Sequence, residues 1–165
     1  GRCCRRCSRY HGGGSIGGNN MYSAQNVANF VLQTQRSFGC PVNNFKLQQI
    51  LYFVQANFLT IHNRPCFSDN IEAWDIGPVV PAVYERYKGY GSDAIPKEEC
   101  SNASEISYVD KYLIEGIVTT CMNYSAEALS KITRNQSPWL NSYFPQRKNV
   151  ISKNSFRPFF ASVAV

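Results

Sequence analysis

Apolar residues recur at helical spacing along most of the chain, most clearly between Asn43 and His62. At about 100° per residue, one arc of this stretch holds Leu47, Ile50, Leu51, Val54, Phe58 and Ile61. Further apolar residues lie outside the arc, namely Tyr52, Phe53 and Leu59. A helix that is apolar on more than one side packs against several neighbours. We therefore expect a central helix with a narrow polar stripe of Lys46, Gln49 and Asn57, and with Gln48 and Gln55 on another side.

Five other segments carry helix signals. Serines that favour the N-cap position precede four of them, at Ser23, Ser107, Ser125 and Ser152. Pro81 is suited to the first turn of the fifth, where its missing N–H costs nothing. Gly39 with Pro41 ends the first helix, and Gly89 ends the one that starts at Pro81. Ser107 and Asp110 resemble a capping box, although Glu or Gln is usual at the second position.

Helical periodicity also predicts which side chains of these helices face the core. For the first helix these are Ala24, Val27, Ala28, Val31 and Phe38. After Ser107 they are Val109, Leu113, Ile117 and Cys121, and after Ser125 they are Ala128, Leu129 and Ile132. In the last helix they are Phe156, Phe159 and Phe160, although Pro158 weakens the helix signal there.

Residues 66–77 break the helical pattern. Ile71, Ala73 and Trp74 with flanking Asp and Gly predict a short strand or β-hairpin. Residues 89–104 are a polar loop, and "SPWLNSYFP" at 137–145 is a turn followed by aromatic anchors. The expected fold is mainly α: a compact single-domain bundle of about five to six helices with a short β-hairpin around residues 66–77. No apolar run is long enough to span a bilayer.

Composition separates the first twenty residues from the rest. The 165-residue chain is 44% hydrophobic and 17% charged, which is typical of one globular domain. Its formal charge of +6 comes largely from Arg2, Arg5, Arg6 and Arg9, in a glycine-rich stretch without acids. The remainder is nearly balanced, so charge alone does not indicate a nucleic-acid partner. We expect residues 1–20 to be a non-native or disordered leader, either translated upstream sequence or a cloning remnant, with Met21 as the start of the domain at 21–165.

Candidate chemistry is sparse. Cys4, Cys7 and His11 have the spacing of half a zinc site, but no second pair of ligands follows. The other cysteines are scattered singly, and with no export signal the reducing cytoplasm is the expected location. A Cys66–His62 dyad lacks an orienting group and an oxyanion site, so we expect no catalytic residue and no enzyme. A winged-helix DNA reader is disfavoured because the helix that would enter the groove is largely apolar and offers only Lys46.

Four segments together resemble a known family. They are "KLQQILYF" at 46–53, "IEAWDIGPVV" at 71–80, "VYERYKGYG" at 83–91 and "SAEALSKITRNQSPW" at 125–139. The chain is similar over roughly residues 22–160 to the Panacea domain, the SocA-like antitoxin family that includes phage-associated proteins of the GepA type. It departs from the family at Ala56, Asn57 and Phe58, where Gly-Trp-His is frequent, and at Arg134, where histidine is usual.

The resemblance implies a mostly helical domain without cofactor or metal that neutralises a toxin by direct contact. It leaves open a proteolytic adaptor, which would also bind a protease, and a DNA-binding regulator of a prophage or mobile element. We expect Ile71, Ala73 and Trp74 to dock the hairpin on the helices, with exposed neighbours making the contacts to a partner. The predicted partner-binding residues are Lys46, Gln49, Trp74, Asp75, Tyr84, Arg86, Tyr87 and Lys88.

Overall fold

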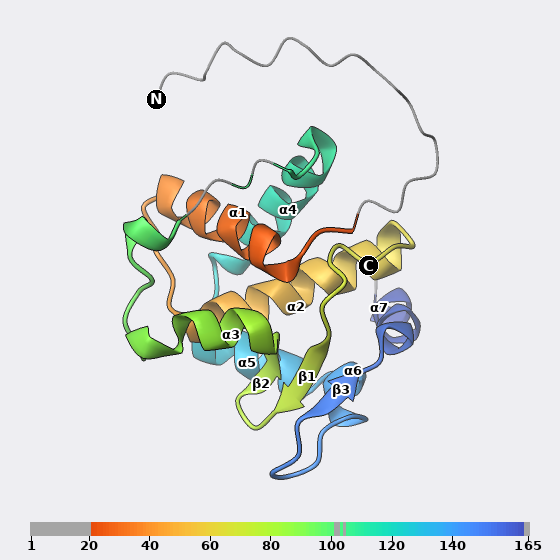
Figure 1. Ribbon diagram of the computed structural model, residues 1–165. Coiled ribbons are helices and arrows are strands. Elements are labelled where there is room, and N and C mark those ends of the chain that lie inside the picture. The colour runs from red at the N-terminus through yellow and green to blue at the C-terminus, as the bar shows by residue number, and fades with distance from the viewer. Residues whose placement is uncertain (1–20, 101–102, 104, 164–165) are drawn as a thin grey trace.

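The structure, a computed structural model, describes residues 21–100, 103 and 105–163. Within these ranges the chain is mainly helical and carries one small antiparallel sheet (Figure 1). The helices are α1 (Ala24–Ser37), α2 (Asn44–Ile61), α3 (Pro81–Tyr87), α4 (Tyr108–Cys121), α5 (Ala126–Arg134), α6 (Ser137–Leu140) and α7 (Phe156–Val163). The strands β1 (Ile71–Trp74), β2 (Gly77–Val79) and β3 (Asn149–Ile151) are arranged in the order β2-β1-β3. The predicted mainly α fold is confirmed; the expected leader, with the disfavoured half zinc site in it, lies outside the described residues.

The serine caps explain where several helices begin. The hydroxyls of Ser23, Ser107 and Ser125 each accept a hydrogen bond from a backbone N–H in the first turn that follows. Each cap satisfies one of the N–H groups that a helix leaves unpaired at its start. Ser152 instead caps a 3₁₀ turn, Lys153–Ser155, that leads into α7. Pro158 lies in the first turn of α7, where a missing N–H is tolerated.

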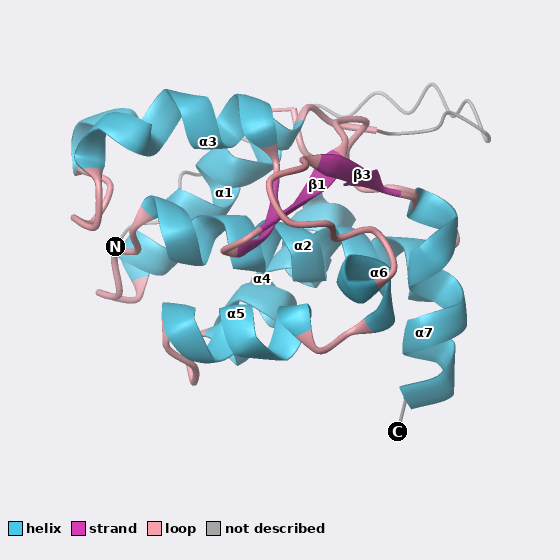
Figure 2. Cartoon of the chain, turned by 90° about the horizontal axis from the view of Figure 1, so that it is seen from below, coloured by secondary structure: helices cyan, strands magenta, loops and turns pink. Residues whose placement is uncertain are grey.

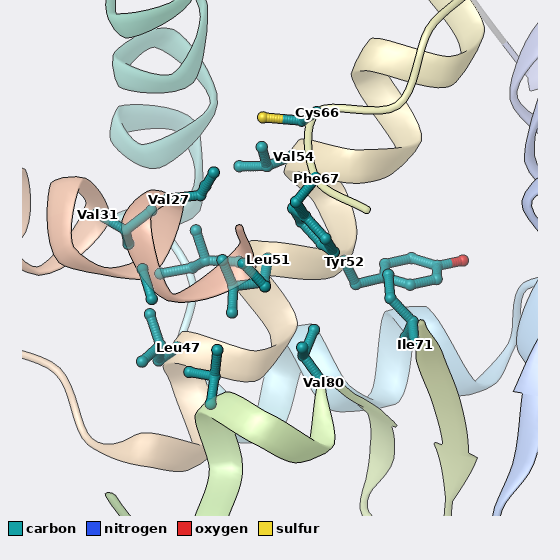
Figure 3. Close-up of a cluster of buried hydrophobic side chains, with 14 of the residues drawn as sticks. Val27, Val31, Leu47, Leu51, Tyr52, Val54, Cys66, Phe67, Ile71 and Val80 are labelled. Carbon is teal, nitrogen blue, oxygen red and sulfur yellow. The ribbon is translucent and has the colours of Figure 1, made fainter. Parts of the chain in front are cut away.

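Helix α2 is the centre of the molecule, as predicted. It contacts α1, α3, α4, α5, α7 and β2, and its neighbours surround it in both views (Figures 1 and 2). Leu47, Leu51 and Val54 of α2 lie in the core with Val27 and Val31 of α1 (Figure 3). Burying a side chain of this size contributes about 1.5–3 kcal/mol. Ile61 was predicted to join this core but is 66% exposed at the end of α2.

The glutamines of α2 are buried, which corrects the prediction of a polar surface stripe through Gln49. Oε1 of Gln48 accepts a 2.9 Å hydrogen bond from the backbone N–H of Val80. The Gln55 side chain bonds the backbone of Cys66 and Phe67, at 2.8 Å each. Buried polar groups have to be paired, so these amides fix the chain segments on either side of the hairpin to the central helix.

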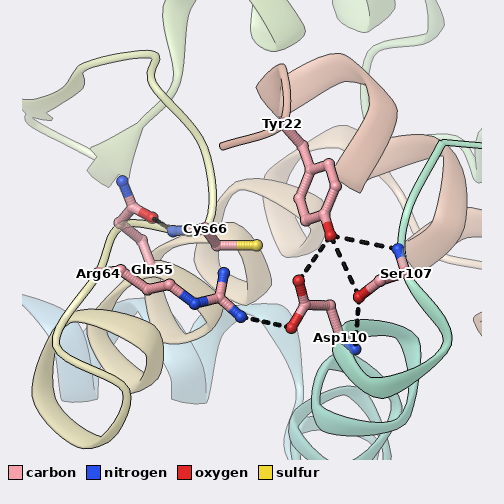
Figure 4. A network of polar contacts seen from close by, with 6 residues as sticks. All are labelled: Tyr22, Gln55, Arg64, Cys66, Ser107 and Asp110. Atoms are coloured by element: carbon pink, nitrogen blue, oxygen red, sulfur yellow. Dashed lines mark hydrogen bonds and ion pairs between the residues drawn. The ribbon is translucent and has the colours of Figure 1, made fainter. Parts of the chain in front are cut away.

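Helix α4 is rotated relative to the prediction. Its buried residues are Asp110, Ile114, Val118 and Cys121, whereas Val109 is exposed. Asp110 points inward because it accepts hydrogen bonds from the Tyr22 hydroxyl and from Arg64, at 2.6 Å each (Figure 4). The backbone N–H of Ser107 donates to the Tyr22 hydroxyl. Tyr22 therefore occupies the place that the Glu or Gln of an ordinary capping box would fill.

The sheet differs from the predicted hairpin in two respects. β1 and β2 form an antiparallel hairpin, displaced a few residues along the chain from the predicted position. The third strand, β3, pairs with the other edge of β1, placing Ile71 opposite Ile151. This pairing brings the loop that precedes β3 alongside the hairpin.

Helix α6 was predicted as a turn and is a single helical turn that begins with Ser137 and Pro138.

Candidate partner-binding surface

The hairpin is anchored through its turn. Gly77 has a φ of +121°, and a Cβ at this position would lie 3.1 Å from Oε1 of Gln49 and 3.4 Å from Oγ1 of Thr133. Only glycine fits this backbone conformation and this close approach. The Thr133 hydroxyl donates a 2.9 Å hydrogen bond to Oε1 of Gln49, and the Ser130 hydroxyl donates to the carbonyl of Ile76. Helices α2 and α5 thereby hold the hairpin turn rigidly.

Trp74 faces outward from the anchored hairpin. Ile71 and Ala73 are buried, whereas Trp74 is only partly buried. Its ring makes a T-shaped contact with Tyr84, with 4.9 Å between the ring centroids. Nζ of Lys148 lies 4.0 Å from the Trp74 ring centroid, a cation–π contact. Trp74 is therefore held between α3 and the loop that precedes β3.

Asp75 connects the hairpin turn to that loop. It accepts a 2.6 Å hydrogen bond from the Tyr143 hydroxyl, which raises the pKa of Tyr143. Tyr143 stacks on Trp139 with 4.2 Å between centroids, and the Trp139 indole donates to the carbonyl of Trp74. These contacts fix the positions of Asp75 and Trp74 relative to the loop. Their ordered arrangement leaves little conformational entropy to be lost on binding a partner.

A groove of about 230 Å³ lies among these side chains. Three of the predicted partner-binding residues line it, Trp74, Asp75 and Tyr84. The others in its lining are Ile76, Gln146, Arg147 and Lys148, which the sequence did not single out. No local signal identifies that loop, because only the pairing of β3 with β1 brings it to Trp74. We call these seven residues the hairpin surface.

The remaining predicted residues lie elsewhere. Arg86 lies in the last turn of α3, and Lys88 directly follows this helix. Both side chains are exposed, and they pair with Glu99 and Glu85 respectively. Lys46 is half-buried and lies near Cys121. Tyr87 was predicted to be exposed but is fully buried, where its hydroxyl accepts a 2.7 Å hydrogen bond from Gln25. Gln49 is also fully buried in the hairpin anchor.

Cys66, one member of the dyad considered from the sequence, is fully buried. Burial, with a smaller effect of the Asp110 carboxylate, raises the pKa of the Cys66 thiol (Figure 4). A buried thiol with a raised pKa is a poor nucleophile. His62 packs its ring against Phe58. In the described ranges, no three His, Cys, Asp or Glu side chains lie close enough together to hold a metal ion.

The described part of the chain is thus a mainly α domain that presents aromatic and basic side chains around an anchored hairpin. Residues 47–140, more than half of the chain, match the family model described as "Antitoxin SocA-like, Panacea domain". The chain belongs to this family, as its sequence motifs had suggested.

One curated relative is similar over part of its length. It is the antitoxin SocA of Caulobacter vibrioides (strain NA1000 / CB15N), which is 38% identical over 68 residues. The aligned region is 41% of this chain and 36% of the relative. No solved structure matches the chain significantly. Among the described residues, no helix is both long and apolar enough to cross a membrane.

Proposed function

We propose that this protein is an antitoxin that neutralises a cognate toxin by direct protein–protein binding through the hairpin surface. Membership of a SocA-like antitoxin family supports the antitoxin role. The partial burial of Trp74 is the observation that supports this binding site. Trp74 is the tryptophan of the family's I-x-A-W segment, and it lies beside Tyr84 and Lys148. Tryptophan, tyrosine and arginine are the side chains that most often dominate binding energy at interfaces.

The chemistry of the hairpin surface suits a partner with acidic and apolar groups. Arg147 and Lys148 lie beside the rings of Trp74 and Tyr84, with Asp75 as the acid in the groove. Asp75 keeps its acceptor oxygens while it receives the hydrogen bond from Tyr143, but the two cations outnumber this single acid. Arg86 and Lys88 extend the basic character along the α3 segment, although each has an intramolecular acidic neighbour.

Co-expression tests the proposal. The full chain is expressed in bacteria together with each immediately neighbouring open reading frame, and growth is scored. We expect one neighbour to stop growth when expressed alone and to be harmless in the presence of this protein. Purified complexes should then form with a single partner. The absence of a toxic neighbour under any level of induction would contradict the antitoxin function.

Two further measurements separate direct neutralisation from the alternatives. A toxin half-life that is unchanged by this protein supports neutralisation by binding, whereas a shortened half-life indicates delivery to a protease. A gel shift with duplex DNA at physiological salt tests the regulator, whose binding would weaken steeply as salt rises.

A further inference from the structure

A second, larger groove lies on another part of the molecule. It has a volume of about 930 Å³ and runs between α2, α4, α5 and α7. Helices α4, α5 and α7 each pack against α2, and Figure 2 shows α5 and α7 on the side that faces the viewer. The lining is largely apolar and includes Phe53, Leu113, Ile117, Leu129 and Phe160. None of the residues predicted to bind a partner lines this groove.

Large apolar side chains remain exposed around this groove. Tyr112 is 75% exposed and Ile61 is 66% exposed, and Tyr124 and Ile132 are also accessible. Ile61 continues the apolar arc of α2, but no described element covers it. Isolated exposed apolar residues are ordinary, but a contiguous apolar patch on a groove is typical of an interaction site. The groove therefore has the properties of a surface that is covered in a complex.

Gly116 gives a second, independent reason to regard the groove as an interaction site. It lies within α4 on the groove, its φ is not positive, and a Cβ there would meet no atom within 4 Å. Neither the backbone nor the packing of this protein therefore requires glycine. Glycine inside a helix costs about 0.5–1 kcal/mol relative to alanine. Its missing side chain would allow another backbone to approach α4 closely.

The polar groups of the groove indicate the conformation of the occupant. The hydroxyls of Thr119 and Thr120 both donate to the carbonyl of Gly116, at 3.0 Å, and are thus already used within α4. An extended peptide would bury an N–H and a C=O group at each residue, more than the remaining polar side chains of the lining, such as Asn57 and Thr60, could pair. A helix pairs its own backbone groups and can present apolar side chains at i, i+3, i+4 and i+7 to a groove.

Charge adds a second requirement. Glu115 is exposed on the groove, and among the ion pairs of the described residues none includes it. Among the lining residues, Glu115 is the one acidic side chain, and none is Lys or Arg. A Lys or Arg beside the apolar face of the occupant would pair with Glu115.

We propose that this groove binds an amphipathic helix of the toxin, with aliphatic anchors and a basic residue facing Glu115. This inference rests on the proposed antitoxin function and adds a second contact surface to it. The hairpin surface and the groove would then hold two parts of the same partner. Two linked contacts bind more tightly than either does alone when the geometry allows both.

The test pairs variants in the groove with matched controls outside it. Gly116→Leu fills the groove, and Gly89→Leu adds the same side chain where a Cβ also meets nothing within 4 Å. Tyr112→Lys places a positive charge in the groove, and Tyr108→Lys places it one turn earlier on α4, outside the lining. Circular dichroism and thermal unfolding establish that each variant is folded before binding is measured.

Two probes are used with the full chain. The first is the toxic neighbour that the wild-type protein neutralises. The second is a labelled synthetic helix of about 18 residues with leucines at i, i+3, i+4 and i+7 and lysines elsewhere, compared with a scrambled peptide of the same composition. We expect both groove variants to weaken binding of each probe by at least about tenfold, or 1.4 kcal/mol. The two controls should bind like the wild type, and the scrambled peptide should not saturate.

Gly116→Ala gives a signature that a purely structural role would not produce. It should raise the melting temperature, because alanine favours the helix, and yet weaken binding of both probes. Equal binding by the groove variants and the wild type, or no saturable binding of the amphipathic peptide, would overturn the groove proposal. A concentration-dependent dimer in sedimentation that Tyr112→Lys dissociates would overturn it in favour of a second copy of this chain.

The two proposals fail in different ways. If the wild type protects cells and the groove variants protect equally well, the antitoxin function stands and the groove proposal is wrong. If the wild type protects against neither neighbour, the antitoxin function fails, and with it the assignment of the occupant to a toxin. The peptide titration then still decides whether the groove selects an amphipathic helix.

Discussion

The Tyr22 hydroxyl donates a 2.6 Å hydrogen bond to Oδ2 of Asp110, a residue 88 positions further along the chain. The same hydroxyl accepts from the backbone N–H of Ser107. Asp110 is only 2% exposed and also pairs with Arg64. This network joins the start of the described chain to the first turn of α4. Removing one partner of such a buried network leaves the others unpaired, which costs more than the bond itself contributes.

Tyr22→Phe should therefore destabilise the protein by about 1–3 kcal/mol. The substitution keeps the ring but leaves the Ser107 N–H and one Asp110 oxygen without the hydroxyl. Urea unfolding should show a lower midpoint with an unchanged slope. Tyr108→Phe is the matched control, because Tyr108 is 87% exposed. Equal midpoints for Tyr22→Phe and the wild type would contradict the structural role of the network.

Gly77→Ala should also destabilise the protein, by about 2 kcal/mol or more. Alanine would have to adopt a backbone φ of +121°, which L residues disfavour. Its Cβ would also press on Gln49 and Thr133. Gly89→Ala is the control, since its Cβ would point into open space. Thermal or chemical unfolding of the two variants checks the difference. A Gly77→Ala protein as stable as Gly89→Ala would show that the turn tolerates a different conformation.

The two tryptophans should respond differently to truncation. Trp74→Ala is expected to weaken toxin binding by at least about 2 kcal/mol while leaving the protein folded. Trp139→Ala is expected to lower the free energy of unfolding by about 3–5 kcal/mol, because Trp139 is buried and stacked on Tyr143. Calorimetric binding and urea unfolding measured on both variants separate the two effects. If Trp74→Ala unfolds the protein, Trp74 stabilises the fold and is not a binding residue.

Stability should fall in alkali partly because of Cys121. Burial raises the pKa of this thiol to about 11 from its ordinary value of 9.0. The unfolded state therefore loses the proton first, and the stabilisation that is complete below about pH 9 is lost as the pH rises towards about 11. The slope contributed by one such group is at most about 1.4 kcal/mol per pH unit.

Cys121→Ala should flatten this part of the pH dependence. The free energy of unfolding is measured across this pH range under reducing conditions for the variant and the wild type. Cys40→Ala is the control, because Cys40 is exposed. The comparison uses slopes, since the alanine also removes some packing at every pH. Parallel curves for Cys121→Ala and the wild type would show that Cys121 does not titrate in this way.

Local patterns predicted most of the helices. Serine caps and glycine or proline stops are read from neighbouring residues, so they identified the starts of α1, α4 and α5 and the end of α1 to within a few residues. The family motifs were also visible, because their spacing is local. The contact roles predicted for Trp74, Asp75, Tyr84, Arg86, Lys88 and Lys46 stay predictions. The structure brings three of them, Trp74, Asp75 and Tyr84, to one groove.

Burial was harder to predict for polar and terminal residues. Periodicity places glutamine on the surface, yet Gln49 is buried because the hairpin turn and Thr133 supply its partners. Tyr87 is buried for a similar reason, since Gln25 of α1 reaches its hydroxyl. Ile61 was predicted to be buried but is exposed, because the apolar arc of α2 extends beyond the elements that cover it.

By itself, the sequence determined the helical content, the central place of α2 and the membership of the family. The first two follow from the spacing of apolar residues and from capping chemistry, which act over a few residues, and the family follows from its sequence motifs. Only the tertiary structure decided that β3 pairs with β1, that Lys148 lies on Trp74 and that an apolar groove stays open beside Gly116. Those relationships join residues far apart in the chain, and their free energy depends on how whole helices pack against each other.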